Sequence, residues 1–174
     1  EQPSPPTLVS LDWHQDLDPP CDEQCQWLGE LDVNDYKAIG HFCWDGLRDS
    51  NDGHILAAAY LNLISDIHVV QKQREESPGE FVDIAGRKHM IRCYQSVQEL
   101  TEAVSAQEHS SVILDIDLDY FTESSEPCGG GPDIQLVDQQ TIAACLDPTT
   151  PFMSWIFPRL AGVSIATEPE YCGG

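Results

Sequence analysis

Two short apolar runs in this chain each lead into a cluster of acidic residues, and this feature limits the folds that the chain can adopt. Runs of four or five apolar and β-branched residues are typical of buried strands. In open α/β sheets, ligands lie just beyond the carboxyl ends of such strands. The residues at these two ends are Asp12, His14 and Asp16 after residues 7–11, and Asp115, Asp117 and Asp119 after residues 111–114.

The spacing within each cluster indicates metal binding. Along an extended backbone, residues i, i+2 and i+4 point to the same side, so two strands could aim six ligands at one place. One imidazole among carboxylates suits a hard or borderline divalent ion such as manganese better than a structural zinc. The chain has only 8 Lys and Arg against 30 Asp and Glu, too few to neutralise such clusters easily. We therefore predict a two-metal hydrolytic site, although a lone Asp-x-Asp more often caps a turn.

Composition narrows the class of protein. The 174 residues, 41% of them hydrophobic, fit a single globular domain spanning residues 1–174. No apolar stretch is long enough to span a bilayer, and seven irregularly spaced cysteines favour a reduced, cytoplasmic protein. Cys21 and Cys25 are interpreted as incidental thiols rather than half of a zinc site. The formal charge of −22 argues against nucleic acid or an anionic membrane as partner, and it is compatible with a cationic substrate.

Strand and helix patterns alternate, which predicts a three-layer αβα fold of the α/β class with a mostly parallel central sheet. The expected strands are residues 7–12, 67–71, 81–84, 89–94, 111–117 and 162–167. The expected helices are residues 53–65, 96–107, 135–146 and 151–160. The Gly/Pro-rich residues 122–133 fit a disordered connection and a mobile lid equally well, and residues 18–26 are expected to form another wall of the cleft. We also expect N-terminal and C-terminal segments of the domain to be missing from the chain.

The two clusters resemble the metal signature of the arginase/deacetylase superfamily, where one strand ends in Asp-x-His-x-Asp and a later one in Asp-x-Asp. The chain is more closely similar to the peptide arginases, which convert arginine side chains within ribosomally made peptides to ornithine and urea. The segments that carry this similarity are residues 11–16, 51–54, 114–121 and 168–174. The resemblance implies an arginase-like fold, two Mn(II) ions and an arginine-containing precursor peptide as partner.

The resemblance also implies roles for the matched residues. The implied metal ligands are Asp12, His14, Asp16, Asp115 and Asp117. Of these, Asp12 and Asp115 would bridge the two ions. The superfamily adds an upstream histidine, which has no counterpart before Asp12, and Asp119 is an addition to the arginase pattern.

Four residues receive catalytic or binding roles from the resemblance. His54 resembles the proton-shuttling histidine of arginases, and Asp16 would pass the proton of the nucleophile to the leaving amine. Glu168 would hold the guanidinium through charge-assisted hydrogen bonds, with Glu170 as the competing candidate.

Three alternatives stay open. The Asp115-x-Asp117 pair also matches the nucleophile motif of haloacid-dehalogenase-type phosphatases, although that interpretation leaves the first cluster unexplained. Another ureohydrolase or deacetylase of the same superfamily would act on free arginine, agmatine or an acylated lysine. A non-catalytic domain would use a structural metal site and bind a peptide. The missing upstream histidine favours this alternative.

Overall fold

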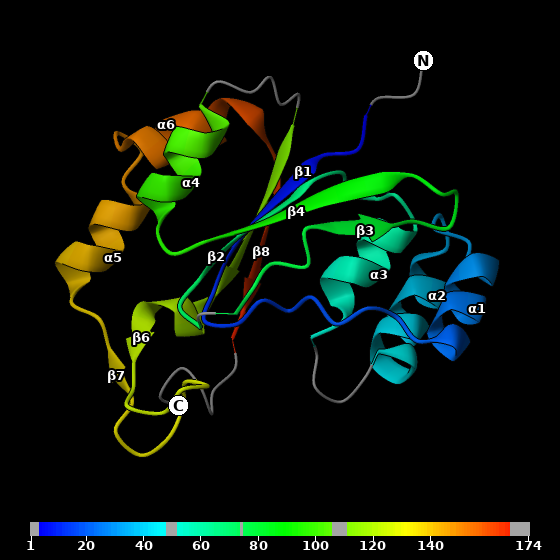
Figure 1. Ribbon diagram of the computed structural model, residues 1–174, viewed down its shortest axis with the longest axis horizontal. Coiled ribbons are helices and arrows are strands. Elements are labelled where there is room, and N and C mark those ends of the chain that lie inside the picture. Colours follow the sequence, from blue (N-terminus) through cyan, green and yellow to red (C-terminus); the bar gives the residue numbers. More distant parts are fainter. Residues whose placement is uncertain (1–3, 48–51, 74, 106–110, 168–174) are drawn as a thin grey trace.

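A six-stranded sheet forms the centre of the structure, a computed structural model that describes residues 4–47, 52–73, 75–105 and 111–167 (Figure 1). In order across the sheet, the strands are β3 (Glu80–Val82), β4 (Lys88–Tyr94), β2 (Ile67–Gln71), β1 (Thr7–Asp12), β5 (Val112–Asp117) and β8 (Leu160–Ala166). Neighbouring strands are parallel except β3 and β4, which run antiparallel. The prediction of an α/β fold with a mostly parallel sheet is therefore confirmed.

Helices cover both faces of the sheet (Figure 1). One layer contains α4 (Val97–Val104), α5 (Gln139–Leu146), α6 (Pro151–Ile156) and the 3₁₀ turn η3 (Phe157–Arg159). The other contains α1 (Asp22–Glu30), α2 (Tyr36–His41), the π-helical turn η1 (Phe42–Gly46) and α3 (His54–Tyr60). Leu11 and Leu114 pack with the first layer, whereas Leu8 and Ile67 pack with the second. This division of the core follows from the alternation of side chains along a strand.

The pairing of β1 with β5 positions the two acidic clusters. β1 is buried along its whole length between β2 and β5. Ser10 lies opposite Asp115 in this pair, and Leu11 lies opposite Ile116. Because the strands are parallel and in register, Asp12 comes next to Asp117, and both clusters begin at the same edge of the sheet.

Several helix predictions needed correction. α1 and α2 were not predicted, because only Gln24 and Leu28 of α1, and no residue of α2, are buried, so neither has a strong apolar period. Residues 135–136 were assigned to a helix but form β7 (Gln135–Leu136), which pairs with β6 (Thr122–Glu123). The helix begins only at Gln139, because the Asp138 side chain accepts hydrogen bonds from the backbone N–H groups of the first turn. The helix expected over residues 53–65 ends at Tyr60, just before Asn62 adopts a positive φ of 54°.

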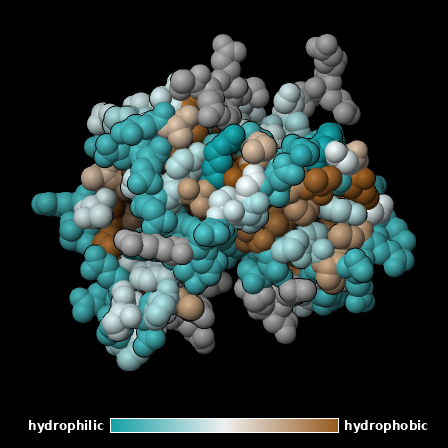
Figure 2. Space-filling view, in the orientation of Figure 1, coloured by the Kyte–Doolittle hydropathy of each residue, from teal (hydrophilic) through white to brown (hydrophobic). Residues whose placement is uncertain are grey.

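One face of the molecule is largely polar. In the face that Figure 2 shows, hydrophilic side chains predominate, with apolar side chains visible between them. Among the described residues, no helix has the length and apolar character needed to cross a membrane.

The turn between β3 and β4 depends on one buried carboxylate. Asp83 accepts hydrogen bonds from the backbone N–H groups of Ala85 (2.8 Å) and Arg87 (2.8 Å), and from Nε of Arg87 (2.7 Å). Burial acts to raise the pKa of Asp83, but these hydrogen bonds outweigh it and lower the pKa.

Asp83→Ala is therefore expected to lower the free energy of unfolding by about 2–4 kcal/mol at neutral pH, since three donors would lose their shared buried acceptor. An acid with a lowered folded pKa stabilises the protein above its ordinary pKa of 3.8, and this contribution disappears as the pH falls through the folded value. Urea denaturation of wild type and variant should show the difference shrinking as the pH falls below 3.8. A difference that does not change with pH would contradict the assigned role of the charge.

Candidate metal centre

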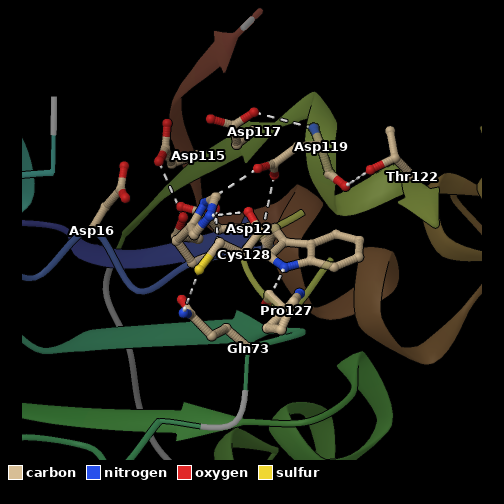
Figure 3. Close-up of polar contacts among 12 residues, drawn as sticks. Asp12, Asp16, Gln73, Asp115, Asp117, Asp119, Thr122, Pro127 and Cys128 are labelled. Carbon is tan, nitrogen blue, oxygen red and sulfur yellow. Dashed lines mark hydrogen bonds and ion pairs between the residues drawn. The ribbon is translucent and has the colours of Figure 1, made fainter. Parts of the chain in front are cut away.

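Both acidic clusters meet at the carboxyl ends of β1 and β5 (Figure 3). Two groups of three residues there could hold a metal ion, with ligand atoms that lie within 4.8 Å of one another in each group. The groups are Asp12, His14 and Asp16, and Asp12, Asp117 and Asp119. Asp12 belongs to both, which is the geometry expected of a residue that bridges two ions.

The side chain of His14 is oriented by both ring nitrogens. Nε2 lies 2.9 Å from the backbone carbonyl oxygen of Cys128, which can only accept, so Nε2 carries a proton and donates it. Nδ1 lies 3.7 Å from Oδ1 of Asp12 and 3.3 Å from Oδ2 of Asp119. A histidine that binds a metal characteristically donates its other ring N–H to a carbonyl or a carboxylate. His14 therefore has the orientation of a ligand that binds through Nδ1.

The pKa values of the residues in the first cluster are shifted because several carboxylates are buried close together. Burial raises the pKa of Asp12, and burial together with the charge of Asp12 raises the pKa of Asp16 to about 7. Interactions with Asp119 and Asp12 raise the pKa of His14 to about 11. Protons thus balance part of the negative charge in the protein alone. A divalent cation would take over this role, and its binding would release protons.

The surroundings of the Asp119 side chain indicate whether these residues fit a metal ion. Its side chain is fully buried, and Oδ1 accepts a hydrogen bond of 3.0 Å from the backbone N–H of Trp13. Among the described residues, Oδ2 accepts no hydrogen bond, and it lies 3.3 Å from Nδ1 of His14. The residue belongs to the group with Asp12 and Asp117. A buried carboxylate is unfavourable unless a positive charge is near, and a divalent cation in this group would supply one. The donor set, oxygen-rich with one imidazole, fits a divalent ion such as Mn(II).

Asp115 lies outside both groups. Its oxygens accept hydrogen bonds from Ser10 Oγ (3.1 Å) and Ser164 Oγ (2.6 Å), from the strands on either side. Burial acts to raise the pKa of Asp115, but His54 and the two serines more than compensate, so the pKa is lowered. Asp115 therefore remains ionised. The structure supports the placement of this residue at the centre, while its expected role as a bridging ligand stays a prediction.

His54 lies between two acidic side chains at the first residue of α3. Its Nδ1 is 3.9 Å from Oδ2 of Asp16, and its Nε2 is 3.9 Å from Oδ2 of Asp115. The side chain is 45% exposed, against 13% for Asp115, so His54 connects the centre with solvent. This is the position that a proton shuttle requires.

The loops, rather than strand alternation, place part of the first cluster. β1 ends at Asp12, and Asp16 adopts a positive φ of 50° in the segment that follows. The three residues do meet, but the expected reason, alternation along one strand, was wrong because β1 ends at Asp12. His14 and Asp16 lie in the irregular segment after β1, although the structure still brings them together with Asp12.

The segment 122–133 packs against the first cluster. The indole N–H of Trp13 donates to the carbonyl oxygen of Pro127 (3.3 Å), next to the Cys128 carbonyl that holds His14. Gly129 has a positive φ of 69°, and a Cβ at this position would lie 3.0 Å from the Trp13 ring. A glycine is thus required where the loop approaches the ring. The structure places this segment over the first cluster, and its expected movement as a lid stays a prediction.

Sequence reasoning missed the part played by Lys72. Its ammonium lies over the rings of Trp13 (5.1 Å) and Tyr120 (5.6 Å), and it donates a hydrogen bond to the carbonyl oxygen of Thr122. Lys72 thereby connects the segment after β1 with the segment after β5. Its location directly after the predicted strand 67–71 was the available signal, because that strand lies next to β1.

The candidates Glu168 and Glu170 lie outside the described residues. In comparisons with known proteins, no family model, curated protein or solved structure matches this chain.

Proposed function

We propose that the protein is a manganese-dependent hydrolase that converts arginine within a peptide to ornithine and urea. The observation that carries this proposal is the sharing of Asp12 between two potential metal groups, with His54 beside them on the exposed side. Two Mn(II) ions held by such groups would supply a water molecule that ionises near neutral pH. The arginase-like character of the fold is part of the proposal and rests on the motifs.

The side chains around the centre have distinct tasks in this reaction. Asp12, His14, Asp16 and Asp117 would hold the ions. The oxygen of water adds to the guanidinium carbon, and the bond from that carbon to Nε of arginine breaks. The departing nitrogen takes up a proton and leaves as the ornithine amine. His54, within 3.9 Å of Asp16 and in contact with solvent, is placed to deliver that proton.

The charge of the protein supports a cationic substrate. The chain has a formal charge of −22, and the ionised Asp115 beside His54 offers negative charge at the exposed side of the centre. Lys72, a cation close to the centre, already contacts two rings and a backbone carbonyl. It is therefore a poor receptor for the α-carboxylate of free arginine, which favours arginine within a peptide. Glu168 and Glu170 remain the proposed partners of the guanidinium.

The test is incubation of the manganese-loaded protein with an arginine-containing peptide. We expect a mass loss of about 42 Da per modified arginine, the difference between a guanidino group and an amine, together with one urea. Free arginine is the control and should react more slowly than the peptide. Faster turnover of free arginine would reject the peptide substrate but keep the hydrolase. Full metal loading without urea from either substrate would reject the proposed reaction.

A further inference from the structure

We infer that Asp119 is itself a metal ligand, that the deeper metal position consists of Asp12, Asp117 and Asp119, and that Asp115 lies outside it. The inference rests on the metal binding assumed in the proposed function, but not on the reaction. All three residues of this group are buried, whereas His14 and Asp16 of the other group are partly exposed. The group combines residues from both clusters.

The burial of Asp119 is the first argument. The residue has no exposed surface, and Oδ2 accepts no hydrogen bond in the part of the chain that the structure describes. Oδ1 is satisfied by the backbone N–H of Trp13, and Oδ2 lies 3.3 Å from Nδ1 of His14. Burying an ionised carboxylate is costly unless a positive partner is near, and a divalent cation held together with Asp12 and Asp117 would be such a partner.

The spacing of the ligand atoms is the second argument. One ligand atom from each of Asp12, Asp117 and Asp119 lies within 4.8 Å of the other two. Ligand atoms around one octahedral ion, each about 2.1 Å from it, are about 3 Å apart when adjacent and about 4 Å apart when opposite. The three atoms are therefore close enough for one ion to bind them all after a small movement.

Local folding explains how Asp119 reaches this place. β5 ends at Asp117, and the 3₁₀ turn η2 (Leu118–Phe121) follows directly. The side chain of Asp117 accepts a hydrogen bond of 3.2 Å from the backbone N–H of Asp119, which bends the chain back toward β1. The hydroxyl of Thr122 then donates to the backbone carbonyl of Asp119 (2.8 Å) and fixes the turn. These bonds place Asp119 beside Asp12 rather than further along the strand.

Asp115 provides the matched comparison. It belongs to the same strand end and carries the same functional group, but serine hydroxyls already donate to both of its oxygens. Its side chain is 13% exposed and belongs to neither metal group. A neutral substitution should therefore affect metal binding much more at Asp119 than at Asp115.

The experiment is a titration of metal-free wild type, Asp119→Asn and Asp115→Asn with Mn(II) alone, with free Mn(II) measured by electron paramagnetic resonance. We expect wild type to bind two ions and Asp119→Asn to lose affinity at one position by more than about 100-fold. Losses of 10- to 100-fold are typical for residues that only orient a ligand. We expect Asp115→Asn to bind both ions with less than about a 10-fold change. Asp117→Asn should lose the same position as Asp119→Asn.

Three results would overturn the inference: unchanged Mn(II) binding by Asp119→Asn, an equal loss in Asp115→Asn, or no uptake by wild type. Circular dichroism and thermal unfolding without metal check that each variant folds. If Asp119→Asn does not fold, the smaller Asp119→Ser takes its place, and the rise in melting temperature on adding Mn(II) to wild type and Asp115→Asn must still be equal. Two bound ions without urea release would reject the proposed function while leaving this inference intact.

Discussion

Asp12→Ala is expected to abolish Mn(II) binding at both positions and to reduce urea release to background. Asp12 is the one residue that both metal groups share, and only 2% of its surface is exposed. Its Oδ1 also accepts a hydrogen bond of 2.8 Å from the backbone N–H of His14. The substitution therefore removes a shared ligand and loosens the turn that positions a second one.

Metal analysis and the peptide assay measure this effect, and Asp45→Ala is the matched control. Asp45 is an exposed aspartate in η1 that pairs with His41 at 2.8 Å, so its removal changes the net charge equally. This control should retain both ions and full activity. An Asp12→Ala protein that still binds two Mn(II) ions with wild-type affinity would contradict the shared-ligand assignment.

The pKa of Asp12 separates loss of metal from loss of folding. An acid whose folded pKa is raised disfavours the folded state once the pH exceeds its ordinary pKa of 3.8, because the charged form is then buried. The isosteric Asp12→Asn should therefore unfold at no lower temperature than wild type in metal-free buffer at pH 7. Its metal binding should nevertheless be lost, and this combination excludes a folding defect as the cause.

The sheet and the proximity of the two clusters could be predicted because buried parallel strands are easily recognised in a sequence. Such strands appear as continuous apolar runs, and each of the six expected strands overlaps a strand of the observed sheet. Their carboxyl ends then share one edge, which is sufficient to bring Asp12 and Asp117 together without knowledge of any contact. The start of α4 also follows a sequence rule: Ser96, a residue type typical of helix N-caps, accepts a hydrogen bond from the backbone N–H of Glu99.

The detailed ligand set could not be predicted, because it depends on where each strand stops. The alternation rule applies to extended backbone, whereas β5 gives way to a 3₁₀ turn at Leu118 and brings Asp119 into the cluster. The carbonyl of Cys128, which orients His14 across 114 residues of sequence, is a backbone atom and leaves no compositional signal. Helices with few buried residues, such as α2, likewise lack the periodic pattern on which prediction depends.

His54→Ala is expected to lower kcat by about 10²–10⁴-fold while both metal ions stay bound. That range is typical for the loss of a positioned general acid or base. His54 belongs to neither metal group, and its ring nitrogens lie 3.9 Å from Asp16 and from Asp115. The substitution should therefore remove a route for protons without removing a ligand, which distinguishes it from Asp12→Ala.

Single-turnover and steady-state assays on the peptide, together with metal analysis, measure this separation. His41→Ala is the matched control, since His41 is 66% exposed and pairs with Asp45. Because the His54 side chain is 45% exposed, added imidazole should reach the vacated space and restore part of the rate in His54→Ala but not in Asp12→Ala. Loss of metal from His54→Ala in proportion to its loss of activity would show that His54 acts as a ligand. Unchanged kcat would instead remove it from the reaction and leave Asp16 to transfer the proton alone.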